Sequence, residues 1–301
     1  MENSRPLVFD IKRGALEDGP GIRTTVFFKG CVLRCRWCQN PESIQAGVEI
    51  GFYAAHCLRC GDCVAACGRG AISLENPARI DRGRCDRCGD CVRACPGRGL
   101  RLVGEFYPVE ELADKLLRDR VFYEVSGGGV TFSGGEPTLH LAYLSSLLQA
   151  LKKQGIHTAL QTNGFFDWPE FKEKVLDWVD LIMFDVKLAD PRMHLKYTGR
   201  GNGRILKNLA RLLESRPDAV LPRIPLIPGM TATVPNLRAL SGLLQRLQVT
   251  RCSLLPYNPT GFSKAEPIGK SVSPRLSLRL MSPGEEQRCR EIFSWAELIA
   301  F

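Results

Sequence analysis

The stretch FKGCVLRCRWCQNPES, residues 28–43, contains three cysteines, Cys31, Cys35 and Cys38, and no fourth. It overlaps the end of a β-forming run, Arg23–Lys29, so the cysteines follow the carboxyl end of a predicted strand. Closed structural metal sites take four protein ligands, whereas a catalytic site keeps one position open. Three thiolates on a four-iron cubane cluster would leave one iron free to bind another molecule. The stretch therefore predicts a catalytic iron–sulfur site.

Most of the chain alternates short β-rich runs with amphipathic helical patterns. In LAYLSSLLQALKKQG, Leu141, Leu144, Leu148 and Leu151 share one helix face, and Gly155 is the expected stop. Five further strands are predicted, at Gly129–Phe132, His157–Gln161, Leu181–Lys187, Ala219–Leu226 and Cys252–Tyr257. Six strands joined by helices predict a parallel α/β sheet, in which ligands bind at the carboxyl ends of the strands.

A cysteine repeat interrupts this pattern after the first strand. CLRCGDCVAAC begins at residue 57 and CDRCGDCVRAC at residue 85, and each reads C-x2-C-x2-C-x3-C. In that spacing three thiolates hold one cubane cluster, and the fourth cysteine ligates the other cluster. The predicted ligand sets are Cys57, Cys60, Cys63 and Cys95 for one cluster, and Cys67, Cys85, Cys88 and Cys91 for the other. Structural zinc is the alternative, but zinc sites usually have longer gaps between cysteine pairs.

We therefore predict two domains. Residues 52–104 form a ferredoxin-like insert with two [4Fe–4S] clusters. Residues 1–51 and 105–301 together form the α/β domain. Gly68 follows the first copy of the repeat where Pro96 follows the second, which weakens the turn signal without changing a ligand.

Composition limits the class of protein. The chain has 301 residues, of which 44% are hydrophobic, and 13 cysteines. The start resembles no secretory signal, so we expect a cytoplasmic protein with reduced thiols. No apolar run is long enough for a membrane span. The formal charge of +9 is scattered along the chain, and three clusters would bring it to about +4, so we expect no nucleic-acid partner. Cys252 and Cys289 match no cluster pattern and are predicted to be structural.

The motifs together resemble a known family. C-x3-C-x2-C is the radical S-adenosylmethionine (SAM) motif, and DGPGIRTTVFFKGCVLRCRWCQNPE, residues 18–42, closely resembles the signature of the glycyl radical enzyme activating enzymes. That family includes the pyruvate formate-lyase activating enzyme. The resemblance covers essentially the whole chain, and the cysteine repeat resembles its multi-cluster subgroup. It implies a partial (β/α)6 barrel that binds SAM.

The resemblance also implies contacts with SAM. In SGGEP, residues 133–137, it assigns the turn to the amino group of SAM. The aromatic ring of Trp37 would face the adenine, and in MFDVKL the lysine would lie near the SAM carboxylate and the aspartate near the ribose or a cation. The residues implied are Trp37, Gly134, Gly135, Glu136, Asp185, Lys187 and Arg223. Ordinary turns and a salt-bridged strand end are the plain structural alternatives.

Some positions depart from the pyruvate formate-lyase activating type. Gln161 replaces an aspartate, which leaves a monovalent cation site in question although Thr162 and Asp185 remain. Gln39 and Asn258 replace histidines, and either can hydrogen-bond a ribose but cannot titrate near neutral pH. Asp18, in DGPGIR, would lie near the glycine of the partner protein.

The implied activity is the activation of a glycyl radical enzyme. SAM would be cleaved reductively, and the 5′-deoxyadenosyl radical would abstract a glycine α-hydrogen from the partner, with a flavodoxin or ferredoxin as electron donor. Two alternatives remain: another radical SAM enzyme with auxiliary clusters, such as a peptide- or sulfatase-maturing oxidase, or a ferredoxin-like electron carrier with a degenerate barrel.

Overall fold

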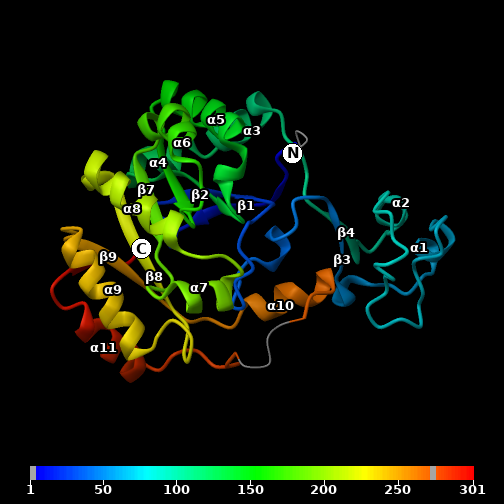
Figure 1. Ribbon diagram of the computed structural model, residues 1–301. Coiled ribbons are helices and arrows are strands. Elements are labelled where there is room, and N and C mark those ends of the chain that lie inside the picture. Colours follow the sequence, from blue (N-terminus) through cyan, green and yellow to red (C-terminus); the bar gives the residue numbers. More distant parts are fainter. Residues whose placement is uncertain (1–4, 272–275) are drawn as a thin grey trace.

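The computed structural model describes residues 5–271 and 276–301 (Figure 1). Its main sheet has the strand order β1-β2-β5-β6-β7-β8-β9-β10, and β3 pairs with β4 separately. The strands are β1 (Val8–Ala15), β2 (Arg23–Phe28), β3 (Glu49–Phe52), β4 (Leu100–Val103), β5 (Gly129–Gly134), β6 (His157–Thr162), β7 (Leu181–Asp185), β8 (Val220–Leu226), β9 (Arg251–Pro256) and β10 (Glu297–Leu298). The helices are α1 (Asp62–Ala65), α2 (Asp90–Arg93), α3 (Val109–Leu117), α4 (Arg120–Ser126), α5 (Leu141–Lys153), α6 (Trp168–Lys174), α7 (Pro191–Thr198), α8 (Gly203–Ser215), α9 (Val234–Arg246), α10 (Gly261–Ala265) and α11 (Pro283–Ile292).

The six predicted strands are β2, β5, β6, β7, β8 and β9, and they run parallel to one another. The prediction of a mostly parallel α/β sheet is therefore confirmed. The sequence analysis missed both edge strands. β1 is antiparallel to β2 and is interrupted by register shifts, and β10 pairs with β9 over two residues only.

The predicted helix LAYLSSLLQALKK is α5, and its apolar face is buried. Leu144, Leu147, Leu148 and Leu151 are completely inaccessible to solvent. Gly155 follows the helix with a positive φ of 73°, a conformation that glycine adopts without steric cost. The helix packs against α3 and α6 on one side of the sheet (Figure 1).

The main sheet is open but curved. A cavity of about 920 Å³, here called the lateral cavity, is lined from both edges of the sheet. Phe9 and Asp10 come from β1, whereas Ser253 and Leu254 come from β9. Because side chains from opposite edges line one cavity, the sheet bends around it. Among the described helices, none is long and apolar enough to cross a lipid bilayer.

The cysteine-rich segment has a small core of its own. Ile50, Ile72, Ile80 and Leu100 are buried there together with Cys63 and Cys91. Figure 1 shows this segment projecting from one side of the main body, with β3 and β4 at its base. The two copies of the repeat fold alike, because α1 and α2 occupy the same four positions in each.

Candidate active site

The three cysteines of the 28–43 stretch lie in a loop that follows β2. Helix α7 holds this loop in place. The amide of Arg34 donates to the carbonyl of Thr198 at 2.7 Å, and the amide of Arg36 donates to the carbonyl of Tyr197 at 3.1 Å. The last carbonyls of a helix have no partner within the helix, so the cysteine loop also satisfies the end of α7.

All three cysteines line one cavity of about 290 Å³, here called the inner cavity. Further residues that line it lie at or just after the carboxyl ends of β5, β6 and β7, or within β8. These residues include Ser133, Gly134, Gly135, Gln161, Thr162, Asp185, Lys187 and Arg223. The structure therefore brings these predicted residues together beside the three cysteines.

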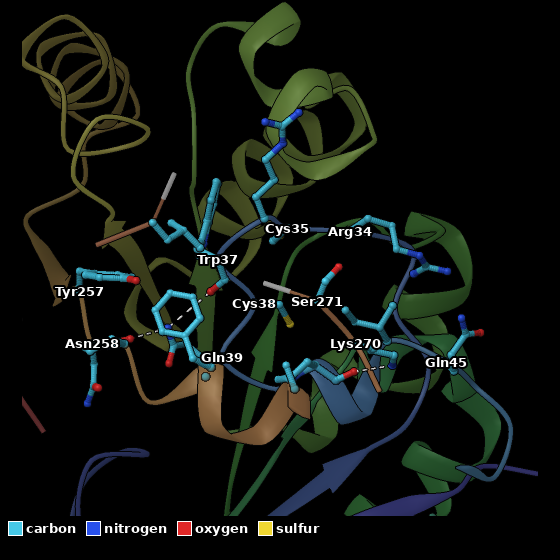
Figure 2. A pocket seen from close by; sticks show the side chains of 18 of the residues that line it. Arg34, Cys35, Trp37, Cys38, Gln39, Gln45, Tyr257, Asn258, Lys270 and Ser271 are labelled. Carbon is cyan, nitrogen blue, oxygen red and sulfur yellow. Dashed lines mark hydrogen bonds between the residues drawn. The ribbon is translucent and has the colours of Figure 1, made fainter. Parts of the chain in front are cut away.

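A second cavity of about 410 Å³, here called the outer cavity, borders the cysteine loop (Figure 2). Cys35, Trp37, Cys38 and Gln39 line both this outer cavity and the inner one. Figure 2 shows Gln39 joined to the backbone of Asn258, and Gln39 Nε2 donates to the carbonyl oxygen of Asn258 at 2.8 Å. The two residues that stand in place of histidines thus contact each other.

The donor set suits an iron–sulfur cluster. All thirteen cysteines are free, and burial raises the pKa of Cys31 to about 12 and also raises the pKa values of Cys35 and Cys38. Such thiols stay protonated unless a metal replaces the proton. Asn163 donates from Nδ2 to Cys31 Sγ at 3.6 Å. In residues 5–271 and 276–301, no three Cys, His, Asp or Glu side chains are grouped to hold a single metal ion.

The Glu136 carboxylate forms hydrogen bonds within the protein. Its side chain is completely buried, and its carboxylate accepts from Thr138 N and Oγ1, Thr162 Oγ1 and Asn163 N at 2.6–3.1 Å. Four donors fill about the whole accepting capacity of a carboxylate. Glu136 does not line the inner cavity, so what it does in this structure is join the ends of β5 and β6. Burial raises its pKa against these hydrogen bonds.

The two residues before Glu136 must be glycine because backbone atoms of neighbouring segments lie against them. A Cβ on Gly134 would lie 2.3 Å from the amide nitrogen of Phe28, and one on Gly135 would lie 2.1 Å from the carbonyl oxygen of Gly30. Gly134 also has a positive φ of 109°. The atoms that approach these two glycines belong to Phe28, at the end of β2, and to Gly30, just after it.

Asp185 joins two cations at the wall of the inner cavity. Lys187 Nζ donates to Asp185 Oδ2 at 2.8 Å, and Arg223 Nη2 donates to Asp185 Oδ1 at 2.9 Å. Burial alone would raise the pKa of Asp185, but the two cations lower it. Burial alone would lower the pKa of Lys187, but Asp185 and the cysteines raise it. The group therefore stays ionised near neutral pH, and it carries one net positive charge.

Asp18 and Gln161 are connected inside the sheet. Gln161 Nε2 donates to Asp18 Oδ1 at 2.9 Å, and Gln161 Oε1 accepts from Ser133 Oγ at 2.6 Å. Thr25 Oγ1 donates to the other carboxylate oxygen of Asp18 at 2.8 Å. Asp18 and Gln161 both line the lateral cavity, and Gln161 lines the inner cavity as well. The substituted glutamine thus links the DGPGIR loop to the cysteine site.

The cysteines of the insert influence one another's pKa values in two overlapping sets. Burial raises the pKa of Cys63, Arg79 lowers it, and the thiols of Cys95 and Cys57 raise it further. Burial raises the pKa of Cys91 to about 11, with smaller contributions from Cys85, Cys67, Cys88 and then Cys63. Each set includes the fourth cysteine of the other copy, Cys95 or Cys67, whereas Cys60 contributes to neither set and Cys63 to both. Cys252 and Cys289 are buried in the main core, far from both groups in the sequence.

The two copies of the repeat share a left-handed backbone pattern. Arg59 and Arg87, at equivalent positions, have positive φ values of 55° and 65°, and Gly61 and Gly89 follow with 91° and 84°. Residues with positive φ on either side of a cysteine can turn backbone N–H groups toward a concave site, as at many iron–sulfur clusters. A residue other than glycine rarely adopts such a conformation without a structural reason.

Comparison with known proteins shows the family of this chain. A model of the radical SAM superfamily matches residues 25–235. The chain is 37% identical to the (2S)-3-sulfopropanediol dehydratase activating enzyme of Klebsiella oxytoca, over 89% of this chain and 87% of that protein. It is 39% identical to the trans-4-hydroxy-L-proline dehydratase activating enzyme of Clostridioides difficile, over 94% and 93%. This chain belongs to the glycyl radical enzyme activating enzymes of the radical SAM superfamily.

The fold of this activating enzyme also resembles a solved structure outside the group. Streptococcus suis SuiB bound to its precursor peptide SuiA is 16% identical, with a TM-score of 0.50 over 88% of this chain and 43% of SuiB. At this identity the likeness concerns the fold alone.

Sequence analysis missed two polar residues of this activating enzyme's site. Asn163 contacts Cys31, and its turn TNG after a strand was the available signal. Glu42 lines the lateral cavity, and its buried Oε2 has no hydrogen-bond partner in the described structure. Burial raises the pKa of Glu42. Its signal was its position four residues after Cys38, in NPES.

Proposed function

We propose that Cys31, Cys35 and Cys38 hold one [4Fe–4S] cluster with an open iron, and that this chain uses it with SAM to activate a glycyl radical enzyme. One observation carries the proposal: three free thiols line the same cavity as a buried group with a net positive charge. The curved, mostly parallel sheet around the site supports the partial (β/α)6 barrel.

The residues of the inner cavity would bind and orient SAM. Lys187 and Arg223 provide one positive charge more than Asp185 neutralises, which suits the carboxylate of SAM and an anionic cluster. Trp37 offers an aromatic face between the inner and outer cavities, and Gln39 and Asn258 lie beside it. When bound, the cluster and SAM supply reductive carbon–sulfur cleavage and the removal of a glycine α-hydrogen from the partner.

Glu136, Gly134, Gly135 and Thr162 would act indirectly. They fix the turns after β5 and β6, so that backbone groups of these turns face the inner cavity at set positions. A direct contact between the Glu136 carboxylate and SAM is not needed for this role. A monovalent cation at Asp185 would have to displace Lys187 or Arg223, because both already pair with that carboxylate.

The insert would hold two further [4Fe–4S] clusters, one on Cys57, Cys60, Cys63 and Cys95 and one on Cys67, Cys85, Cys88 and Cys91. The crossed grouping of thiols and the repeated left-handed residues favour clusters over paired zinc sites. Clusters at the end of a projecting insert could receive electrons from a flavodoxin or ferredoxin and pass them to the site.

The lateral cavity is the proposed entry for the partner's glycine-containing segment. It shares Gln39, Gln161, Arg223 and Asn258 with the inner cavity, and Asp18 lies on its wall. The relatives are activating enzymes for dehydratases, lyases and a decarboxylase, at 35–39% identity. Because these identities are so similar, they do not single out one partner. We propose only that the partner is a glycyl radical enzyme of one of these reaction classes.

The test is 5′-deoxyadenosine formation by anaerobically reconstituted, reduced protein, with and without a peptide that copies a glycyl radical loop. We expect cleavage of SAM that the peptide accelerates, with deuterium passing from an α-deuterated glycine into the product. Cleavage that ignores the peptide would favour another radical SAM reaction. Full iron loading with no cleavage would favour the electron carrier.

Two matched cysteine variants control this experiment. Cys35→Ala should abolish cleavage, because it removes a proposed ligand of the open cluster. Cys289→Ala should leave cleavage intact, because Cys289 packs in the main core away from the cysteine loop. Equal loss in both variants would contradict the assignment of the loop.

A further inference from the structure

Arg79 is an unusual residue of the insert. It lies between the two copies of the repeat, and only 4% of it is exposed. Its backbone has a positive φ of 62°, which disfavours a long side chain. It ends the turn Asn76–Arg79 and precedes Ile80, which pairs with Ile72 across a β-bridge. Glycine or asparagine would fit this conformation more easily. The contacts of the guanidinium must therefore account for an arginine at this position.

The guanidinium is buried without a carboxylate. Nη2 lies 3.8 Å from Cys57 Sγ, Nη1 donates to the carbonyl of Ser73 at 3.1 Å, and the group lies 5.0 Å from the centre of the Phe52 ring. Nε has no acceptor, and within residues 5–271 and 276–301 no acidic side chain forms an ion pair with Arg79. A buried charge is costly unless an opposite charge compensates it.

We propose that Arg79 is the counter-cation of the cluster on Cys57, Cys60, Cys63 and Cys95, and that it raises the reduction potential of this cluster above that of its twin. The inference rests on the proposed function, because it needs clusters in the insert. Reduction adds one electron and one negative charge to a cluster. A buried positive charge that hydrogen-bonds a ligand sulfur therefore favours the reduced form.

The second group of thiols has no equivalent cation. Arg82, three residues before Cys85, is half-buried and donates to the carbonyls of Ile50 and Pro267 at 3.0 Å. Arg69 and Arg84 are exposed, and Arg69 pairs with Asp86. In the described structure, no guanidinium donates to a sulfur of this group, and Cys67 accepts only from the amide of Ala71, at 3.2 Å. The near-identical sequences of the repeat therefore provide unequal electrostatic environments.

The experiment measures the two potentials directly. The full chain is prepared with Cys31, Cys35 and Cys38 changed to alanine, so that only the insert titrates. Dithionite supplies electrons singly, and electron paramagnetic resonance follows each reduction step. We expect two steps, and Arg79→Gln should move the upper step to lower potential while the lower step stays. Arg79→Lys keeps the charge and should move it less.

Arg84→Gln is the control, because it removes an exposed positive charge from the same insert and should move neither step. Unmoved steps in Arg79→Gln at full iron content would overturn the role of Arg79 and leave the clusters in place. No iron in the parent chain would instead overturn the clusters themselves. If Arg79→Gln loses one cluster that Arg79→Lys keeps, charge compensation is supported. Equal loss in both would mean a purely structural role.

Discussion

Asp185→Asn should destabilise the protein strongly. The substitution keeps the shape of the side chain but removes the negative charge between Lys187 and Arg223, whose side chains are only 9% and 10% exposed. Removing one partner of a buried ion pair costs about 3–5 kcal/mol, because the remaining charge stays buried. For a chain of this size, roughly 2 °C of melting temperature corresponds to 1 kcal/mol, so we expect a loss of about 6–10 °C.

The pKa of Asp185 sets the conditions for this measurement. It is lowered in the folded protein, so its stabilising effect is complete above the ordinary aspartate pKa of about 4 and is lost as the pH falls through the lower folded value. Melting followed by circular dichroism under anaerobic conditions near neutral pH therefore measures the whole effect. Iron content must be matched between the samples, because bound clusters also stabilise the folded state.

Two variants make this prediction refutable. Asp177→Asn removes an exposed carboxylate of the neighbouring segment and should change the melting temperature by about 1 °C at most. Adding Lys187→Met to Asp185→Asn removes one of the two unpaired cations, so the double variant should melt above Asp185→Asn alone. A shift in Asp185→Asn no larger than in Asp177→Asn, or additive losses in the double variant, would refute the reasoning.

Two further predictions concern the loop and the clusters. Gly134→Ala places a methyl group against the backbone of Phe28 and should lower the free energy of unfolding by about 3 kcal/mol or more. Gly127→Ala has open space around the new methyl group and should lower it by about 1 kcal/mol. Thermal melting compares the two variants. The reconstituted chain should bind about twelve irons, and replacing Cys31, Cys35 and Cys38 with alanine should remove about four of them. An iron assay in which both chains bind equal amounts would contradict the second prediction.

The sequence was sufficient for the parallel strands and for α5 because their patterns are regular. The strands β2, β5, β6, β7 and β8 are buried along most of their length, and the leucines of α5 repeat at helical spacing. β1 escaped notice because exposed charged residues and register shifts interrupt its alternation. β10 has only two residues, which is too short for any periodicity.

The site was harder to predict in detail than in place. The spacing of Cys31, Cys35 and Cys38 located it, but spacing does not show which atoms a side chain reaches. Glu136 could equally have pointed at a ligand or at Thr162 and Asn163, which follow it by more than twenty residues. These contacts exist only once β5 and β6 lie side by side, so residue patterns alone cannot reveal them.

The attachment of the cysteine loop to α7 has a consequence for assembly. Ordering a free loop costs about 1–2 kcal/mol per residue in backbone entropy. Here the amides of Arg34 and Arg36 donate hydrogen bonds to the end of the helix. Folding of the polypeptide therefore already includes much of the entropy loss of ordering the loop, before iron binds. The loop is thus preorganised for cluster binding. A preassembled cluster would then bind to a protein that has already folded.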